Sequence, residues 1–378
     1  MIYADNAATT KMDIEAFEAM KPFLLEEYGN PSQPYFFSKT ARIALREARG
    51  TIAKCINADP DEIYFTSGGT ESDNWAIKEF GGAAKTKYII TSAIEHKAIL
   101  NACTHMEKQG AIVEYVPVTP DGVILVDELE KKLRERSNSA KANEETIVSV
   151  MFVNNEIGTI EPITQIAEVV HRYGAIFHTD AVQAVGHVAI DVKKMGIDML
   201  SASAHKFNGP KGIGFLYVKK GIDILSHNDG GVQENGKRAG TENVCAIVGM
   251  AKALENNIQN IEYNQKRILE LERIIEDGLL KENIEYIRNG SREHVPGNMS
   301  LSFRGFEGEA LLHRLDLMRI CVSTGSACDS EKTSVSHVLK AINLKEDLAI
   351  GTIRISLGKY NTADEAMQIV DALHKILK

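Results

Sequence analysis

The stretch that decides the fold is EIYFTSGGT, residues 62–70, in which a short apolar strand runs directly into a tight turn with two glycines. A helix follows, with Glu71 and Asp73 near its start. Strand, tight turn and helix in this order form the unit from which helix-covered sheets are built. Glycines let a backbone approach an anion, and a helix N-terminus offers free N–H groups, so a phosphate fits at Gly69 and Thr70. A capped turn without any ligand explains the same residues equally well.

The alternation of strand and helix continues to about residue 243, because the period of the apolar residues keeps switching. We predict strands at 87–92, 112–117, 146–153, 175–180, 198–202 and 214–218. We predict helices at 14–27, 38–57, 96–109 and 163–173. This order is typical of an α/β fold with a mainly parallel sheet and helices on both faces. Ligands of such sheets bind beyond the carboxyl ends of the strands.

The pattern changes after residue 243, where a helical stretch without proline runs to about residue 282. Shorter elements follow at 298–303, 308–314, 335–342, 351–357 and 363–377. A chain of 378 residues is long enough for two domains. We therefore predict a large domain over 15–257 and a small α+β domain over 258–378, with residues 1–14 packing on the small domain.

Composition and charge favour a globular enzyme or binding protein. The chain is 44% hydrophobic and 25% charged, which excludes a disordered or collagen-like protein. A formal charge of −9 argues against sequence-independent nucleic-acid binding, which needs a basic surface. The five irregularly spaced cysteines form no C-x-x-C pair, which favours a reducing compartment. Without a basic and apolar leader or a membrane-length apolar run, we expect a cytoplasmic protein with no signal peptide and no membrane anchor.

Two polar segments that follow predicted strands are candidates for cofactor chemistry. Asp180 ends the strand IFHTD, where a carboxylate can bind a metal, act as acid or base, pair with a protonated ring nitrogen or cap a helix. Gln183 follows within one helical turn and lies near the same edge. Lys206 lies in SASAHKFNGPKG, among small and hydroxylated residues. A reactive amine needs a lowered pKa, which burial and the neighbouring His205 and Lys211 favour; a surface lysine is the alternative.

Cys328 and Arg354 are the candidates in the C-terminal part. Cys328 lies in VSTGSACDS, a loop sequence with almost nothing apolar to bury it, so we interpret it as a reactive nucleophile. The other cysteines lie in apolar patterns typical of buried thiols; they are Cys55, Cys103, Cys245 and Cys321. Arg354 alternates with isoleucines in the strand TIRIS, so it either clamps a carboxylate or faces solvent.

Two further patterns are interpreted as carrying no function. The stretch GVQENGKR, residues 231–238, matches a phosphate-binding loop only in part, because Arg238 stands where Ser or Thr is required. The eleven histidines form no pair with the spacing of metal ligands, so we predict no metal site.

Taken together, these segments resemble the cysteine desulfurases of the NifS/IscS type, which are fold-type-I pyridoxal-phosphate (PLP) transferases of the class V aminotransferase family. The resemblance covers nearly the whole chain, because several long motifs occur in the family order. They are YADNAATT (3–10), GNPS (29–32), TSGGTESDN (66–74), NNEIG (154–158), the Lys206 segment, RAGTEN (238–243), GSAC (325–328) and the Arg354 strand. The resemblance implies a large domain with a mainly parallel seven-stranded sheet and a smaller α+β C-terminal domain.

The resemblance also implies a pyridoxal 5′-phosphate cofactor and the residues that bind it. Lys206 would hold the cofactor as a Schiff base and later move protons on the substrate. His96 would stack on the ring and assist proton transfer, and Asp180 would pair with the ring nitrogen. Asn155 and Gln183 would bond the 3′ oxygen of the ring. The residues implied to hold the phosphate are Gly69, Thr70, Ser203, His205 and, from a second subunit, Thr241.

The implied reaction converts L-cysteine to L-alanine. Arg354, with Asn30 and Asn155, would bind the substrate carboxylate. Cys328 would take the sulfur as a persulfide and pass it to an acceptor protein, such as an iron–sulfur cluster scaffold or a component of another thiolation pathway. The contribution of Thr241 from a second subunit implies a homodimer. Neither a membrane nor a nucleic acid is expected as a partner.

Two other functions are compatible with the same fold. One is a selenocysteine lyase or a related class V PLP aminotransferase, although a transaminase has no need of a nucleophilic thiol such as Cys328. The other is a non-catalytic partner-binding protein. The joint presence of Lys206, Asp180, His96 and Cys328 argues against that function.

Overall fold

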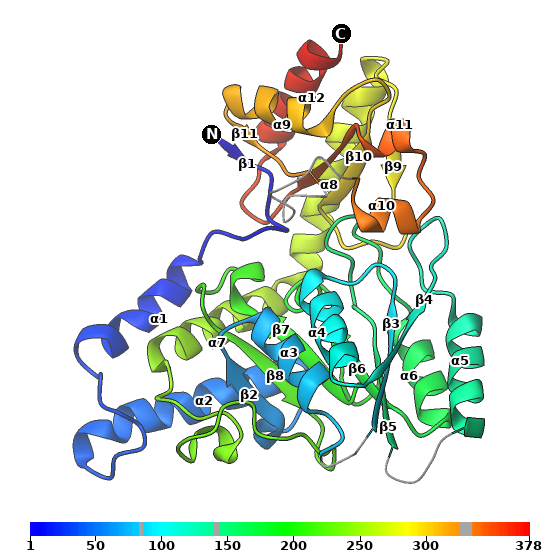
Figure 1. The fold of residues 1–378 in the computed structure, drawn as a ribbon. Helices are drawn as coiled ribbons and strands as arrows, with labels where there is room; N and C mark the ends of the chain where they lie inside the picture. Colours follow the sequence, from blue (N-terminus) through cyan, green and yellow to red (C-terminus); the bar gives the residue numbers. More distant parts are fainter. Residues whose placement is uncertain (83–85, 140–143, 325–334) are drawn as a thin grey trace.

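The computed structural model describes residues 1–82, 86–139, 144–324 and 335–378. Figure 1 shows a large sheet surrounded by helices and a smaller half that contains both ends of the chain. Cys328, the predicted nucleophile, lies outside the described residues. Within the described ranges, no helix combines the length and the apolar character that a bilayer span requires.

The large half is built on a seven-stranded sheet. In spatial order its strands are β2 (Ile63–Thr66), β8 (Gly214–Val218), β7 (Met199–Ser203), β6 (Ile176–Asp180), β5 (Glu144–Ser149), β3 (Thr86–Ser92) and β4 (Ile112–Val116). Neighbouring strands from β7 to β4 are parallel, whereas β8 runs antiparallel to both β7 and β2. The predicted α/β fold with a mainly parallel seven-stranded sheet is therefore confirmed. The carboxyl ends of the parallel strands meet at one edge, where ligands of such sheets bind.

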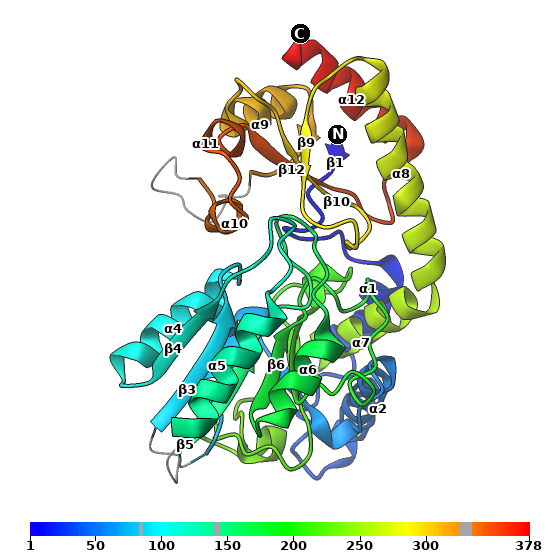
Figure 2. The same cartoon turned by 90° about the vertical axis from the view of Figure 1, so that its right-hand side faces the viewer.

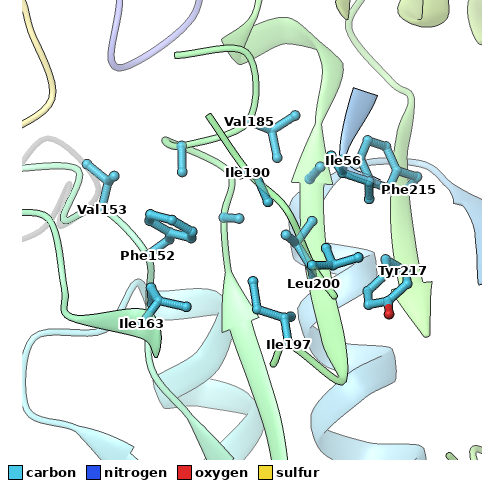
Figure 3. Packing of buried hydrophobic residues seen from close by; sticks show 14 of the residues in the cluster. Ile56, Phe152, Val153, Ile163, Val185, Ile190, Ile197, Leu200, Phe215 and Tyr217 are labelled. Atoms are coloured by element: carbon cyan, nitrogen blue, oxygen red, sulfur yellow. The ribbon is translucent and has the colours of Figure 1, made fainter. Parts of the chain in front are cut away.

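Successive residues of each strand face opposite layers of helices. Ile90 and Val148 belong to the larger core, whereas their neighbours Ile89 and Ile147 belong to the core on the other face. Figure 3 shows the larger core around Leu200. The helices that contribute to the larger core are α1 (Ile14–Leu25), α2 (Lys39–Cys55), α5 (Val126–Ser139), α6 (Ile163–Arg172) and α7 (Val244–Gln259). Those of the other face are α3 (Gly69–Glu79) and α4 (Lys97–Lys108).

The smaller half combines a short sheet with helices. Its antiparallel strands, in spatial order, are β12 (Thr352–Ser356), β10 (Asn298–Ser302) and β9 (Ile287–Asn289). Its helices are α8 (Ile261–Lys281), α9 (Gly308–Leu317), α10 (His337–Ala341), α11 (Glu346–Ala349) and α12 (Ala363–Leu377). The first strand, β1 (Ile2–Tyr3), pairs in parallel with β11 (Ile320–Cys321). Figure 2 shows α8 running along one side, from the large half into the smaller one. The predicted limits of the two domains stay predictions.

The helical stretch predicted at about 243–282 is two helices. The first, α7, ends at Gln259, and α8 begins at Ile261 after Asn260, whose φ of −115° is not helical. Apolar residues of α7 pack into the core of the large sheet, whereas Ile268 and Ile275 of α8 pack into the core of the smaller half. Periodicity does not reveal this break, because the apolar spacing continues while the core that it serves changes.

Candidate active site

A cavity of about 590 Å³ lies at the carboxyl ends of β6 and β7, against residues of the smaller half. Most of the predicted site residues line it: Gly69, Thr70, His96, Asn155, Asp180, Gln183, Ser203, His205, Lys206 and Arg354. They come from the start of α3, the residue before α4, the ends of β6 and β7, the segments that directly follow β5, β6 and β7, and β12. The cavity therefore gathers side chains that are far apart in the sequence.

The N-terminus of α3 forms one corner of the cavity. Gly68, directly before the helix, has a φ of 152°, which favours glycine. A Cβ atom on Gly69 would lie 2.5 Å from Val182 Cγ2, so a larger residue would force Val182 to move. The first N–H groups of a helix have no partner within the helix, and Gly69 and Thr70 both line the cavity. This corner suits a phosphate.

Lys206 ends the short helix η3 (Ala204–Lys206), directly after β7, and lines the cavity. Its Nζ donates to the Ala7 carbonyl at 2.5 Å and to the Ala8 carbonyl at 2.9 Å. His187 supports the lysine backbone, because its Nε2 lies 2.9 Å from the Lys206 carbonyl oxygen. Backbone near the start of the chain therefore borders the lysine site.

His205 is kept neutral beside Lys206. Burial and the charges of Lys206 and Lys211 lower the pKa of His205 to about 4. Its Nδ1 lies 3.1 Å from Thr9 Oγ1, and Ser203 lines the same cavity from the end of β7. A neutral imidazole and a hydroxyl can each donate one hydrogen bond without adding charge. Both side chains can thus add donors to the corner formed by α3.

Asp180 ends β6 and is 5% exposed. Its Oδ1 accepts from the Val182 amide at 2.9 Å. Burial raises the pKa of Asp180, and His96, the Val182 hydrogen bond and Lys206 oppose that rise. A buried carboxyl group with incomplete compensation is suited to pair with a cationic group of a ligand.

His96 is the residue that caps α4, because its Nδ1 accepts from the Ala98 amide at 3.2 Å. Burial lowers the pKa of His96, and the opposing charge of Asp180 does not reverse the shift. A ring nitrogen that accepts a hydrogen bond carries no proton, so the neutral ring has its proton on Nε2. His96 can therefore donate from Nε2 to a group in the cavity.

Arg354 is buried, which excludes the solvent-facing alternative left open by the strand pattern. Its Nη1 donates to the Asn155 carbonyl at 2.9 Å, and its Nη2 pairs with Asp5 Oδ1 at 2.8 Å. Its Nε is buried and has no hydrogen-bond partner among the described residues. A held guanidinium group with donor capacity left over is suited to recognise a carboxylate.

Some predicted residues are not part of this cavity as described. Thr241 lines a separate cavity of about 220 Å³, which shares Ser67 and Gly212 with the main one. Asn30 is not among the residues that line the main cavity, and its side chain accepts a hydrogen bond from a nearby backbone amide. Cys328 lies outside the described residues. The roles of these three residues stay predictions.

The remaining cysteines differ in part from the prediction that all of them are buried. Cys103 in α4 is buried, whereas Cys55, Cys245 and Cys321 are partly exposed. Cys55 ends α2, Cys245 lies in the first turn of α7, and Cys321 ends the two-residue strand β11. The ends of helices and strands are covered by fewer neighbouring residues than their middles. An apolar sequence pattern therefore overestimates the burial of these three cysteines.

Two carboxyl groups of the site were not predicted. Asp5 pairs with Arg354, and Asp73 in α3 is 1% exposed. Ligand atoms of Asp73, His96 and Asp180 all lie within 4.8 Å of one another. A signal for Asp73 existed, because it follows Gly69 by four residues and shares its buried helix face. These are donor types that metals also use, and the predicted absence of a metal stays a prediction.

Comparison with known proteins identifies the family. Residues 2–369 match the family described as aminotransferase class-V. The chain belongs to the class V aminotransferase family. Within this family, the protein named cysteine desulfurase IscS of Dictyoglomus turgidum is 47% identical over an alignment of 380 positions, which covers 100% of this chain and 94% of the relative.

Two solved structures share the fold over 96% or more of this chain. A structure described as a NifS-like protein has a TM-score of 0.91 at 36% identity and covers 100% of this chain and 99% of its own. Another, described as SspA in complex with cysteine, has a TM-score of 0.82 at 34% identity over 96% of this chain and 100% of its own. The resemblance stated from the sequence is confirmed for the family and for the fold.

Class V aminotransferases are PLP enzymes, and the cavity of this member fits that group. The α3 corner, where Gly69 and Thr70 offer the first N–H groups of the helix to the cavity, matches a phosphate. The buried Asp180 carboxyl matches a ring nitrogen that carries a proton, and the Lys206 amine lines the same cavity. The cavity thus offers a complementary group for the phosphate, for the ring nitrogen and for the carbon that the lysine amine binds.

Proposed function

We propose that this class V aminotransferase is a PLP-dependent cysteine desulfurase that converts L-cysteine to L-alanine. The observation that carries the proposal is the convergence of Lys206, Asp180, His96 and Arg354 on one cavity. Whole-length similarity to a cysteine desulfurase, at 47% identity, supports this activity. The structural neighbour described in complex with cysteine supports the substrate class.

The cofactor, when bound, withdraws electrons from the substrate and so weakens the bond between carbon and sulfur. Lys206 would hold it covalently, and Asp180 would face its ring nitrogen. Asn155 and Gln183 would contact the 3′ oxygen. The residues that would hold its phosphate are Gly69, Thr70, Ser203, His205 and Thr241 from a second copy of the chain.

Arg354 binds the carboxylate of the substrate. Its Nη2 is paired with Asp5 at 2.8 Å, so an incoming carboxylate shares or replaces that partner. The Asn155 carbonyl, 2.9 Å from Nη1, keeps the guanidinium group oriented during the exchange. A fixed orientation lowers the entropy lost on binding and favours the amino acid over amines that lack a carboxylate.

Lys206 and His96 handle the protons. With the cofactor and substrate bound, the Lys206 amine would take a proton from the α-carbon of the substrate at Nζ. His96 is neutral with its proton on Nε2, so it can donate that proton where negative charge develops. The low pKa of His96 keeps the ring in this form at neutral pH.

Cys328 is the acceptor of the sulfur. Its thiolate attacks the sulfur atom, the carbon–sulfur bond breaks with its electron pair moving to carbon, and carbon is then protonated to give alanine. A persulfide remains on Cys328 and passes to an acceptor protein, of which an iron–sulfur cluster scaffold is the proposed example. The cytoplasmic location expected from the sequence fits this thiol chemistry.

A homodimer is part of the proposal. Apolar side chains of α1 and the segment after it are widely exposed, among them Leu25 at 81%, Tyr28 at 68% and Phe36 at 86%. Large apolar side chains exposed within one short stretch of the chain favour burial against another chain. A second copy would also bring Thr241 to a phosphate that the first copy holds.

The proposal is tested by incubating the purified protein with L-cysteine and a reductant and measuring alanine and sulfide. Lys206→Ala should abolish the visible absorbance of the cofactor-bound protein and both products. Cys328→Ser should keep the absorbance and cysteine binding but stop sulfide release, while the control Cys245→Ser keeps everything. A colourless protein that forms no alanine would overturn the proposed activity, and full sulfide release by Cys328→Ser would overturn the role of Cys328.

A further inference from the structure

A chain of buried polar side chains lies behind Asp180, and no step of the proposed reaction uses it. Ser149 Oγ on β5 lies 2.9 Å from His178 Nδ1 on β6, and His178 Nε2 lies 3.0 Å from Ser201 Oγ on β7. Ser201 in turn forms a hydrogen bond with the Asp73 carboxyl group on α3. All four side chains are buried, and the last of them, Asp73, also lines the main cavity beside Asp180.

Asp73 has little to compensate a negative charge. Its Oδ1 is buried and has no hydrogen-bond partner among the described residues. The nearest ring nitrogen, His178 Nε2, is 3.9 Å from Oδ1, and burial lowers the pKa of His178 to about 3, so that ring is neutral. The Ser201 hydroxyl is thus the remaining support, and it is uncharged.

Asp180 is better compensated, although it shares the same buried pocket. It accepts a hydrogen bond from the Val182 amide, lies near the neutral His96 ring and is stabilised by the positive charge of Lys206. Two carboxyl groups this close and this buried do not both ionise, and their environments decide which one keeps the proton. Burial and the charge of Asp180 raise the pKa of Asp73 well above its usual value. The proton therefore resides on Asp73.

The titratable groups that face Asp73 come from several elements. They are Asp180 and His178 on β6, and Glu95 and His96 at the start of α4, with Lys206 of η3 acting through Asp180. Glu95 adds a further acid, which also disfavours ionisation of Asp73. Its own pKa is raised to about 8 by burial.

We propose that Asp73 is a positioning residue for Asp180: it remains a neutral carboxylic acid, limits the pair to one negative charge, and supports the Asp180 carboxylate from the α3 side. The inference rests on the proposed function, because it takes Asp180 as the partner of the cofactor ring nitrogen. A second negative charge beside Asp180 would compete for the cation that Asp180 is meant to hold. A neutral acid gives support without that competition.

Two substitutions distinguish the effect of the neutral charge state of Asp73 from the effect of its side-chain support for Asp180. Asp73→Asn keeps the shape and the neutral state, so the visible absorbance and kcat should stay within about twofold of the parent protein. Asp73→Ala removes the support and leaves the Ser201 hydroxyl without its partner. It should lower kcat about tenfold or more, the usual cost of losing a hydrogen-bonded support behind a site residue, with little change in KM.

The protonation state is measured directly by infrared difference spectroscopy of the cofactor-bound protein at pH 7. The parent protein minus Asp73→Asn should contain the C=O band of a protonated carboxyl group. A matched control is Glu161→Gln: Glu161 is buried, its pKa is raised to about 8 by burial, and it does not line the cavity. This control should lose a carboxyl band of its own and keep the parent kcat.

Absence of a carboxyl band in the Asp73→Asn difference spectrum would overturn the inference, as would parent-like kcat in Asp73→Ala or an equal loss in both variants. The infrared result does not depend on the reaction. A parent protein that forms alanine but lacks the band would contradict this inference alone, whereas a protein that has the band but forms no alanine would contradict the proposed function alone.

Discussion

Two groups of buried acidic side chains, one in each half of the molecule, are compensated in opposite ways. In the smaller half, Glu272 of α8 lies 2.9 Å from both His294 Nε2 and Arg288 Nη2. Burial would raise the pKa of Glu272, but the hydrogen bond from His294 and the charge of Arg288 outweigh burial and lower it. In the larger half, the pKa values of Asp73 and Asp180 are both raised, because burial outweighs their partners.

The difference indicates what each charge is for. Glu272 is almost fully paired within the chain, and its ion pair fixes β9 and the segment before β10 onto α8. For Asp73 and Asp180, the partners within the chain do not fully offset the free-energy cost of burying a negative charge. This is expected where a ligand is to supply the missing positive charge. Burial alone does not distinguish these cases; the partners do.

The largest effect is expected for Asp180→Asn. Loss of the charge opposite the ring nitrogen should lower kcat about 10³-fold, the upper range for removing one electrostatic group of a site. The melting temperature of the cofactor-free protein should stay the same or rise, because the amide no longer carries a buried charge. Alanine formation and thermal unfolding measure the two quantities. A fall in both would make Asp180 a structural acid like Glu272.

Glu272→Gln should lower stability and leave kcat unchanged, the reverse of what we expect for Asp180→Asn. Removing one partner of a buried ion pair costs about 3 kcal/mol of unfolding free energy, whereas kcat per folded molecule should not change. Urea unfolding and alanine formation check these outcomes. The matched control is Glu276→Gln, which removes the more exposed partner of Arg288 and should cost less than about 1 kcal/mol. Equal costs in the two variants would contradict the contrast drawn above.

A further prediction concerns the pH dependence of stability. The pKa of buried Glu95 is about 8 when folded and 4.5 in the unfolded reference, so the folded chain binds more protons between these values. Stability from this group is fully present below pH 4.5 and falls by about 1.4 kcal/mol per pH unit as the pH rises toward 8. Glu95→Gln should flatten the slope measured by urea unfolding between pH 5 and 8. An unaltered slope would mean that Glu95 is ionised when folded.

Glu272 contributes with the opposite sign. Its folded pKa is lowered, so its stabilisation is present above the unfolded value and is lost as the pH falls through the folded one. The same urea measurements below pH 4.5 should therefore show a loss in the parent protein that Glu272→Gln lacks.

Much of the fold could be predicted from the sequence, because apolar spacing records which face of each element is buried. The strands near Asp180 and Ser203 were found in this way, with differences at their ends. The break at Asn260 was not found, because it depends on which of two cores the helix meets. That is a property of the assembled molecule.

The candidate site likewise contains residues that the sequence could predict and contacts that depend on the assembled fold. Gly69 and Lys206 were singled out by residue patterns, and His96 and Asn155 were found through the resemblance; the structure places all four on one cavity. The carbonyls of Ala7 and Ala8 were not predicted as lysine contacts, since backbone groups leave no mark in a residue pattern. Asp73 was noticed only as an acid near a helix start, because its neighbour Asp180 is distant in sequence.

The path of residues 2–10 has a consequence for biosynthesis. Ala4 accepts from the Ser356 amide at 2.7 Å, and the Asn6 amide donates to the Ser356 carbonyl at 3.0 Å, so the earliest residues are anchored by a strand near the end of the chain. A ribosome releases these segments far apart in time, and contacts of such separation are costly to close. The lysine pocket can therefore be completed only after synthesis has passed residue 356, more than 340 residues after Ala7 and Ala8.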